Sequence, residues 1–164
     1  MKQKKLTHFD EKGAAKMVDI AHKDKTVRRA CAKGIILMKE ETLNVVNLTS
    51  AEKGDVLGIA RIAGIMGAKK TSELIPLCHA VPISKITIDF FPVKGAIGLE
   101  IVANVKTNAQ TGVEMEALTA VSISSLTIYD MLKSIDKEIE ISGIFLDSKS
   151  GGKSGAFKNS RQRL

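Results

Sequence analysis

The sequence predicts an α+β fold in which an antiparallel sheet packs against helices on one of its faces. Two consecutive segments, ISKITIDFF and LEIVANVKT, alternate polar and apolar residues as half-buried strands do. Two longer segments, one before and one after this pair, place small and apolar residues at helical spacing. Strands next to each other in the sequence and helices outside them are typical of an α+β domain.

The first predicted element is a strand over Val27–Met38, because Gly34 and two adjacent isoleucines are poor helix formers. A helix is predicted over Asp55–Leu74, with Ser50 as a candidate N-cap upstream and Pro76 as the residue that ends it. Three glycines within this helix indicate close approach to a sheet or to another helix.

The second half of the chain predicts two strands, over Ile83–Phe91 and Leu99–Thr107, then a helix over Gly112–Lys133 and a last strand over Ile139–Leu146. The order is therefore β-α-β-β-α-β, which is the ferredoxin-like arrangement with both helices on one face. We expect a single domain over residues 1–164, with a flexible N-terminal arm at 1–15 and a flexible basic tail at 148–164.

Composition limits the classes of function. The chain has 164 residues and a net charge of +7, which favours an anionic ligand such as nucleic acid, a membrane surface or a phosphorylated small molecule. No segment is long and apolar enough to span a membrane, and the N-terminus lacks the apolar core of a secretory signal. Two distant cysteines, Cys31 and Cys78, predict reduced thiols in the cytoplasm.

The loop LIPLCHAVP places Cys78 and His79 side by side between a helix and a strand. A histidine in such a loop can serve as acid, base or phosphate donor near neutral pH, or it can simply cap a neighbouring element. Zinc binding by the pair is weakly supported, because no second Cys/His pair lies at ligand spacing.

The segment TGVEMEALT places Glu114 and Glu116 near a helix N-terminus, where the helix dipole alone favours carboxylates. Because residues two apart point to nearly opposite sides of a helix, we expect at most one of them to face a given site. Met115 between them would be unusual on an open surface, which favours a pocket or an interface.

Two further places offer charged groups. Asp130 and Lys133 lie at i, i+3 near a helix C-terminus and can form a simple surface ion pair. The dipole disfavours a carboxylate there, so Asp130 is the more informative residue. Lys53 and Arg61 could bind phosphate or could equally be solvated. The tail SKSGGKSG is not a Walker A loop, because Asp147 stands where that motif needs glycine.

Several long runs, in the same order along the chain, resemble the molybdenum cofactor biosynthesis protein C family of cyclic pyranopterin monophosphate synthases. They extend from Met17 to Gly155 and are MVDI, KGDVLGIARIAGIMGAKKTSELIPLCH, TGVEMEALTAVSISSLTIYDMLK and SGGKSG. One departure is Ala80-Val81, where the family commonly has Pro-Leu, and it removes no reactive group.

The resemblance implies a lyase that converts 3′,8-cyclo-7,8-dihydroguanosine 5′-triphosphate to cyclic pyranopterin monophosphate with release of pyrophosphate. It implies Asp130, Lys133 and Lys53 as catalytic residues. The implied substrate-binding residues are Leu77, Cys78, His79, Glu114, Met115, Glu116 and Arg28. No resident metal or other cofactor is expected, although Mg²⁺ could accompany the triphosphate.

The resemblance also implies a homohexamer built as a trimer of dimers. The span from Glu116 to Lys133 is about 25 Å along a helix, too long for one nucleotide-sized substrate to touch both ends. We therefore expect Asp130 and Lys133 of one subunit to meet His79, Met115 and Glu116 of another. Two other classes stay open on the residues alone, an RNA-binding module and a regulatory domain without catalysis. Against the first, the two central strands lack RNA-binding aromatics.

Overall fold

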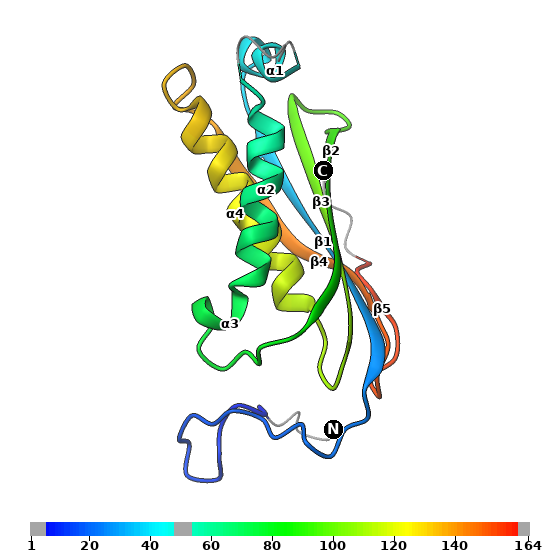
Figure 1. Cartoon of the computed structure of the whole chain (residues 1–164). Helices are drawn as coiled ribbons and strands as arrows, with labels where there is room; N and C mark the ends of the chain where they lie inside the picture. The colour runs from blue at the N-terminus through cyan, green and yellow to red at the C-terminus, as the bar shows by residue number, and fades with distance from the viewer. Residues whose placement is uncertain (1–5, 48–53, 161–164) are drawn as a thin grey trace.

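The strands form one antiparallel sheet in the order β2-β3-β1-β4-β5, seen edge-on in the computed structural model (Figure 1). The structure describes residues 6–47 and 54–160. Its elements are β1 Thr26–Leu37, α1 Glu40–Asn47, α2 Val56–Lys69, α3 Thr71–Leu74, β2 Ile83–Pro92, β3 Gly98–Ala109, α4 Glu114–Leu132, β4 Glu140–Ser150 and β5 Phe157–Lys158.

The first four strands have the ferredoxin-like order, with β1 and β3 in the centre, which confirms the predicted fold class. β1 pairs with β3 in unbroken register from Thr26↔Ala109 to Leu37↔Gly98. Its pairing with β4 is interrupted near Cys31 and near Ile35, where bulges bend the strands. β5 adds a short outer strand that the sequence did not predict.

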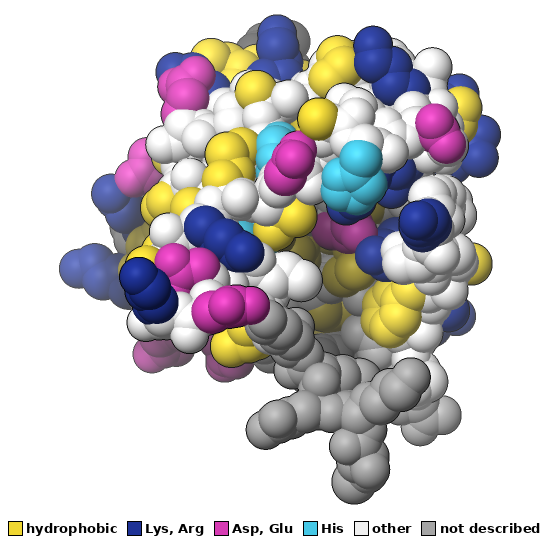
Figure 2. Space-filling model, turned by 90° about the horizontal axis from the view of Figure 1, so that it is seen from below, with side chains coloured by type: hydrophobic (Ala, Val, Ile, Leu, Met, Phe, Trp, Pro, Cys, Tyr) yellow, Lys and Arg dark blue, Asp and Glu magenta, His cyan; other side chains and the backbone are white. Residues whose placement is uncertain are grey.

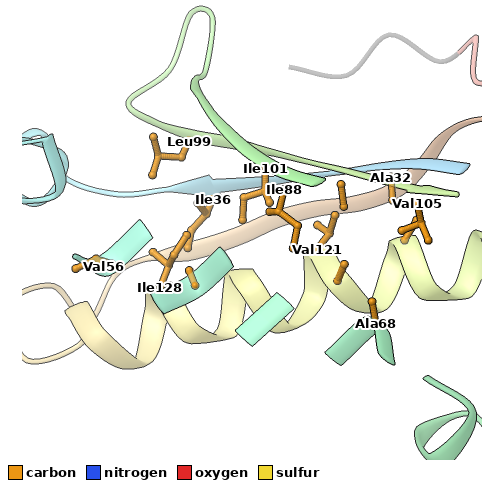
Figure 3. Packing of buried hydrophobic residues seen from close by; sticks show 14 of the residues in the cluster. Ala32, Ile36, Val56, Ala68, Ile88, Leu99, Ile101, Val105, Val121 and Ile128 are labelled. Carbon is orange, nitrogen blue, oxygen red and sulfur yellow. The ribbon is translucent and has the colours of Figure 1, made fainter. Parts of the chain in front are cut away.

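Helices α2 and α4 cover one face of the sheet, and the core lies between these layers (Figure 1). Figure 3 shows side chains of the sheet pointing toward those of the helices. Ile36, Ile101 and Ile128 are fully removed from solvent. Burying each such side chain contributes roughly 1.5–3 kcal/mol, so this small aliphatic interior holds the helices on the sheet without any tryptophan.

The two long helices approach closely because small residues lie between them. Ser124 Oγ of α4 donates a hydrogen bond to the Ala60 carbonyl of α2 at 3.0 Å. A Cβ added to Gly64 would lie 2.8 Å from the Ala120 carbonyl oxygen, and one added to Gly67 would lie 2.6 Å from Ile123 Cγ1. The predicted role in close packing is therefore confirmed for Gly64 and Gly67, whereas a Cβ added to Gly58 would meet only the side chain of the cap Asp55.

Several predicted boundaries differ from the structure. α2 begins after Asp55, whose Oδ1 accepts a hydrogen bond from the Gly58 amide at 2.7 Å, and it ends at Lys69, with the separate turn α3 following. The candidate cap Ser50 lies outside the described residues. α4 begins at Glu114 instead of Gly112. α1 was not predicted, although Glu40 and Glu41 in its first turn suit a helix N-terminus.

The prediction of a flexible tail over residues 148–164 was wrong for the first residues of that segment. β4 continues through Ser150, and β5 pairs with it at Lys149↔Phe157. The Asn159 amide also donates to the Asp147 carbonyl at 2.8 Å. In the N-terminal arm, Phe9 and Ala15 form one isolated bridge. None of the helices within 6–47 and 54–160 is long and apolar enough to cross a membrane.

Candidate active site

A cleft of about 620 Å³ opens at the end of the molecule where α3 stops and α4 starts. Its walls come from three parts of the chain, namely the segment before β1, the loop after α3 and the first turn of α4. Seen from this end, histidine, acidic, basic and hydrophobic side chains surround a hollow (Figure 2). A cleft of this size suits a small ligand rather than a macromolecule.

The loop after α3 brings Leu77, Cys78 and His79 to the cleft. Pro76 prevents the helix from continuing, and the Cys78 amide then donates to the Ile75 carbonyl at 3.0 Å, closing a turn. At the far end of the loop the Thr107 hydroxyl donates to the Pro82 carbonyl at 2.7 Å. All three predicted residues are half-buried in a loop that is fixed at both ends.

The first turn of α4 supplies Glu114, Met115 and Glu116, and all three line the cleft. The expectation that only one glutamate would face a given site was therefore wrong. Glu114 is the first residue of the helix. The cleft passes across this end of the helix, so residues on more than one side of the helix can line it. Lys149 Nζ donates to Glu114 Oε1 at 2.7 Å and so links β4 to this turn.

Glu116 has the environment of a proton-transfer group. Its side chain is 2% exposed, and its buried Oε2 has no hydrogen-bond partner within the described part of the chain. Burial, with a smaller contribution from the charge of Glu114, raises the pKa of Glu116 to about 7. Burial and the two glutamates also raise the pKa of the Cys78 thiol. A carboxyl that titrates near neutral pH can both give and take a proton.

Arg28 lines a second cavity, of about 520 Å³, together with His22, Lys23 and Lys153. Arg28 Nε donates to the Ala109 carbonyl at 2.9 Å, which fixes its guanidinium at the end of β1. Because Lys23 lines both cavities, the second one adjoins the cleft. With three cationic side chains and one acidic residue, Asp24, in its lining, it suits an anionic group.

The segment before β1 was missed as part of the site. Thr7, His8, Val18 and Ile20 line the cleft, and Gln110 holds this segment by donating to the Lys23 carbonyl at 2.9 Å. The run was predicted to be partly a loose arm because it is polar and has no periodicity. Asp10 and Gly13, a turn pattern, offered the one signal of order, and Asp10 Oδ1 accepts from the Ala14 amide at 2.8 Å.

Asp130 and Lys133 lie at the opposite end of α4, outside this cleft. Lys133 Nζ donates to Asp130 Oδ1 at 2.6 Å, and their side chains are 56% and 71% exposed respectively. The hydrogen bond from Lys133 to Asp130 raises the pKa of the lysine. About 21 Å of helix separates Asp130 from Glu116. Lys53 lies outside the described residues.

Arg61 does not belong to the site. Its Nε donates to the Ile88 carbonyl at 2.9 Å, and its guanidinium lies 5.4 Å from the centre of the Phe90 ring. Of the two interpretations of this residue, phosphate binding is thus the weaker. Within 6–47 and 54–160, no group of three or more His, Cys, Asp or Glu side chains could hold a metal ion.

The fold and the cleft define a ferredoxin-like α+β protein with a small-molecule site built from loop and helix-end residues. The MoaC family model matches residues 17–152, and the chain belongs to this family. Two similar proteins are both named cyclic pyranopterin monophosphate synthase. One from Cereibacter sphaeroides is 57% identical over 94% of this chain and 98% of its own length. One from Dinoroseobacter shibae is 56% identical over 93% and 97%.

A third relative, from Mycobacterium tuberculosis, is named cyclic pyranopterin monophosphate synthase 3. It is 55% identical over 93% of this chain and 86% of its own length. The predicted family is therefore confirmed over nearly the whole chain.

Proposed function

We propose that this chain is a cyclic pyranopterin monophosphate synthase, a phosphorus–oxygen lyase of molybdenum cofactor biosynthesis. It converts 3′,8-cyclo-7,8-dihydroguanosine 5′-triphosphate to cyclic pyranopterin monophosphate and releases pyrophosphate. The observation that carries the proposal is that a cleft with proton-transfer groups adjoins a cationic cavity at one end of the chain. A substrate with a ring to rearrange and a triphosphate to cleave needs both.

Rearranging the purine-derived ring requires several proton transfers, for which His79 and Glu116 are suitable. With a pKa of about 7, Glu116 is present in both protonation states at neutral pH. The half-buried Cys78 and Leu77 form an apolar wall beside them, which keeps water away from the ring. We assign Met115, which is 37% exposed, to the rim where the substrate enters.

The triphosphate occupies the cavity beside Arg28. Closing the cyclic phosphate expels pyrophosphate, and the developing charge is stabilised by Arg28, Lys23 and Lys153. Gly152 permits this arrangement, because it has a φ of +71° and an added Cβ would collide with the Arg28 guanidinium. Lys53 is assigned to the same reaction by family resemblance alone.

Asp130 and Lys133 complete the site from a neighbouring subunit. An exposed ion pair about 21 Å from Glu116 along one helix cannot act on a substrate held in the same chain's cleft. A twofold axis across the helix layer would place the end of one α4 near the start of the other. The pair of charges would then face the cleft of the second chain.

An apolar stripe on the helix layer supports such a dimer. Ile59, Ile62 and Met66 follow one another along the outer side of α2 and are 47%, 61% and 56% exposed. Leu126 on α4 is 55% exposed. A row of large apolar side chains on a helix surface is typical of a subunit interface. We assign this surface to the dimer, and three dimers to a hexamer.

The proposed enzyme needs no resident cofactor and has no nucleic-acid or membrane partner. Mg²⁺ would enter the site only together with the triphosphate. The two free, half-buried cysteines suit a reducing cytoplasm.

A turnover assay with the cyclised GTP intermediate tests the proposal. The wild-type protein should form cyclic pyranopterin monophosphate and pyrophosphate in equal amounts. Asp130→Ala should bind the intermediate but form no product. Wild-type protein that binds the intermediate without converting it would instead indicate a regulatory domain, and undiminished turnover by Asp130→Ala would remove Asp130 from the catalytic group.

A further inference from the structure

No helix of residues 6–47 or 54–160 lies on the face of the sheet opposite α2 and α4 (Figure 1), and this face contains a cavity of about 700 Å³. The cavity extends over β2, β3, β1 and the end of β4, and Ala156 and Phe157 at β5 form its outer wall. It shares no lining residue with the cleft that contains His79 and Glu116. The cavity is therefore distinct from the cleft, although it adjoins it where Lys149 pairs with Glu114.

Three cations form a row across this face. Arg29 of β1 is the register partner of Lys106 of β3, and Lys106 is the partner of Lys85 of β2. Register partners on neighbouring strands project to the same side of the sheet, and the alternate residues Ala30 and Val105 are buried under the helices. The three cationic side chains consequently lie next to one another on the open face.

No carboxylate of the described residues forms an ion pair with this row, and Glu114, which lines a small pocket with Arg29, is paired with Lys149. Within the described residues, Arg29, Lys85 and Lys106 take part in none of the five ion pairs, and no Asp or Glu lines the cavity. Asp147 and Glu100 are each paired with another lysine. Asp89 lies four residues from Lys85, about 13 Å along the strand. Like charges directly opposite each other destabilise a sheet, so the row favours binding of an anion.

The rest of the lining indicates which anion fits. The next row across the strands consists of Cys31, Asn104 and Thr87, which offer neutral polar groups and no aromatic platform for nucleic-acid bases. The outer cations are two strand spacings apart, about 10 Å. These features suit a compact chain of phosphates better than an extended nucleic acid.

We propose that the open face of the sheet is a second binding site, for a small molecule with a di- or triphosphate chain. Lys106 binds the centre of the chain, and Arg29 and Lys85 bind its ends. Phe157, 44% exposed at the outer wall, offers an aromatic surface on which a nucleotide base could stack. The source of the phosphates is either a free oligophosphate or a nucleoside triphosphate.

The test is titration calorimetry of the full-length protein with inorganic tripolyphosphate at low salt. The key variant is Lys85→Gln/Lys106→Gln, and the control Lys12→Gln/Lys94→Gln removes two exposed cations elsewhere. Because the cavity beside Arg28 is proposed to bind a triphosphate too, we expect wild type to bind two equivalents per chain. The first variant should keep one equivalent and bind the other at least about tenfold more weakly, because charged hydrogen bonds are lost, and the control should bind as wild type does. Neither variant changes a residue of the candidate active site, so turnover should persist in both.

Fewer than two bound equivalents in the wild-type protein, equal weakening in both variants, or two tight equivalents retained by Lys85→Gln/Lys106→Gln would each overturn the proposal. A second copy of the chain packed on this face would give the first of these results. Repeating the titration with GTP on Phe157→Ala distinguishes the two sources of phosphate. Weakened GTP binding with unchanged tripolyphosphate binding identifies a nucleotide, and no change for either ligand identifies the bare chain.

Discussion

Lys149 Nζ lies 2.7 Å from Glu114 Oε1, and this ion pair joins the end of strand β4 to the first turn of α4 at the cleft. Both side chains are partly shielded, at 29% and 26% exposed. Two residues further along the helix, Glu116 forms no ion pair with any described residue, and its buried Oε2 has no hydrogen-bond partner among them. The protonation of Glu116 therefore depends on whether Glu114 is neutralised.

Lys149→Met tests this dependence. Without the lysine, the uncompensated charge of Glu114 should favour the protonated form of Glu116, so the pKa of Glu116 should rise further. The pH profile of kcat/KM measures the shift. Lys158→Met, which breaks the pair with Asp147 at the sheet edge, is the matched control and should leave the profile in place. An identical profile in both variants would contradict the coupling.

Glu116→Gln should change how stability depends on pH. The pKa of Glu116 is raised from 4.5 to about 7, so the folded wild-type protein binds a proton more tightly than the unfolded chain does. Its free energy of unfolding is then highest below pH 4.5 and falls as the pH rises to 7, by roughly 3 kcal/mol in total. The glutamine variant should lack this decrease.

Chemical denaturation at several pH values measures the effect, with the exposed Glu73→Gln as control. Equal pH dependence in Glu116→Gln and wild type would show that Glu116 is not protonated in the folded state near neutral pH.

Gly64→Ala should destabilise the helix layer. Alanine is a better helix former by about 1 kcal/mol. Here, however, its Cβ would lie 2.6 Å from Ile88 Cδ1 and 2.8 Å from the Ala120 carbonyl oxygen, and overpacking of this kind costs about 1–3 kcal/mol. The collision with backbone should outweigh the gain in helix propensity. Gly143→Ala in β4 meets no atom within 4 Å and serves as control. Equal thermal stability of the two variants would refute the close packing.

Ile62→Glu should break the proposed dimer. The side chain is 61% exposed in the isolated chain, so a charge there is harmless to the subunit but would be buried without a partner in an interface. Size-exclusion chromatography with light scattering should show a smaller species. Ile97→Glu, in the turn between β2 and β3, replaces an exposed isoleucine outside the stripe and should keep the wild-type mass. An unchanged mass for Ile62→Glu would place the interface elsewhere.

The sheet and both long helices were predictable because alternation and helical spacing reflect which side of each element is buried. Ile86 and Ile88 alternate with Lys85 and Thr87, and the structure buries the isoleucine side. α1 was not predicted because it has only 8 residues, too few for a clear period. β5 was missed because its two residues are a strand only through pairing with β4, a contact that local sequence does not encode.

Most individual residues of the candidate site could be predicted from the sequence, but the way the fold brings them together could not. His79 and Glu116 were found from loop and helix-end chemistry together with family resemblance. Thr7 and His8 were missed, because only the folded chain brings the N-terminal segment beside the loop at residues 75–79. The predicted separation of Glu116 and Lys133 follows from helix length alone, and α4 from Glu114 to its C-cap Lys133 retains it. In the proposed arrangement, Asp130 reaches the site from a second chain.

Mixing two inactive variants tests that central claim most directly. Asp130→Ala and Glu116→Gln should each lack activity, since each damages every site of its own oligomer. After dissociation and reassembly of an equal mixture, half of the dimers combine both variants, and one of the two sites in each is intact. Turnover should therefore recover to about one quarter of the wild-type value. Mixed oligomers no more active than either parent would contradict a site shared between subunits.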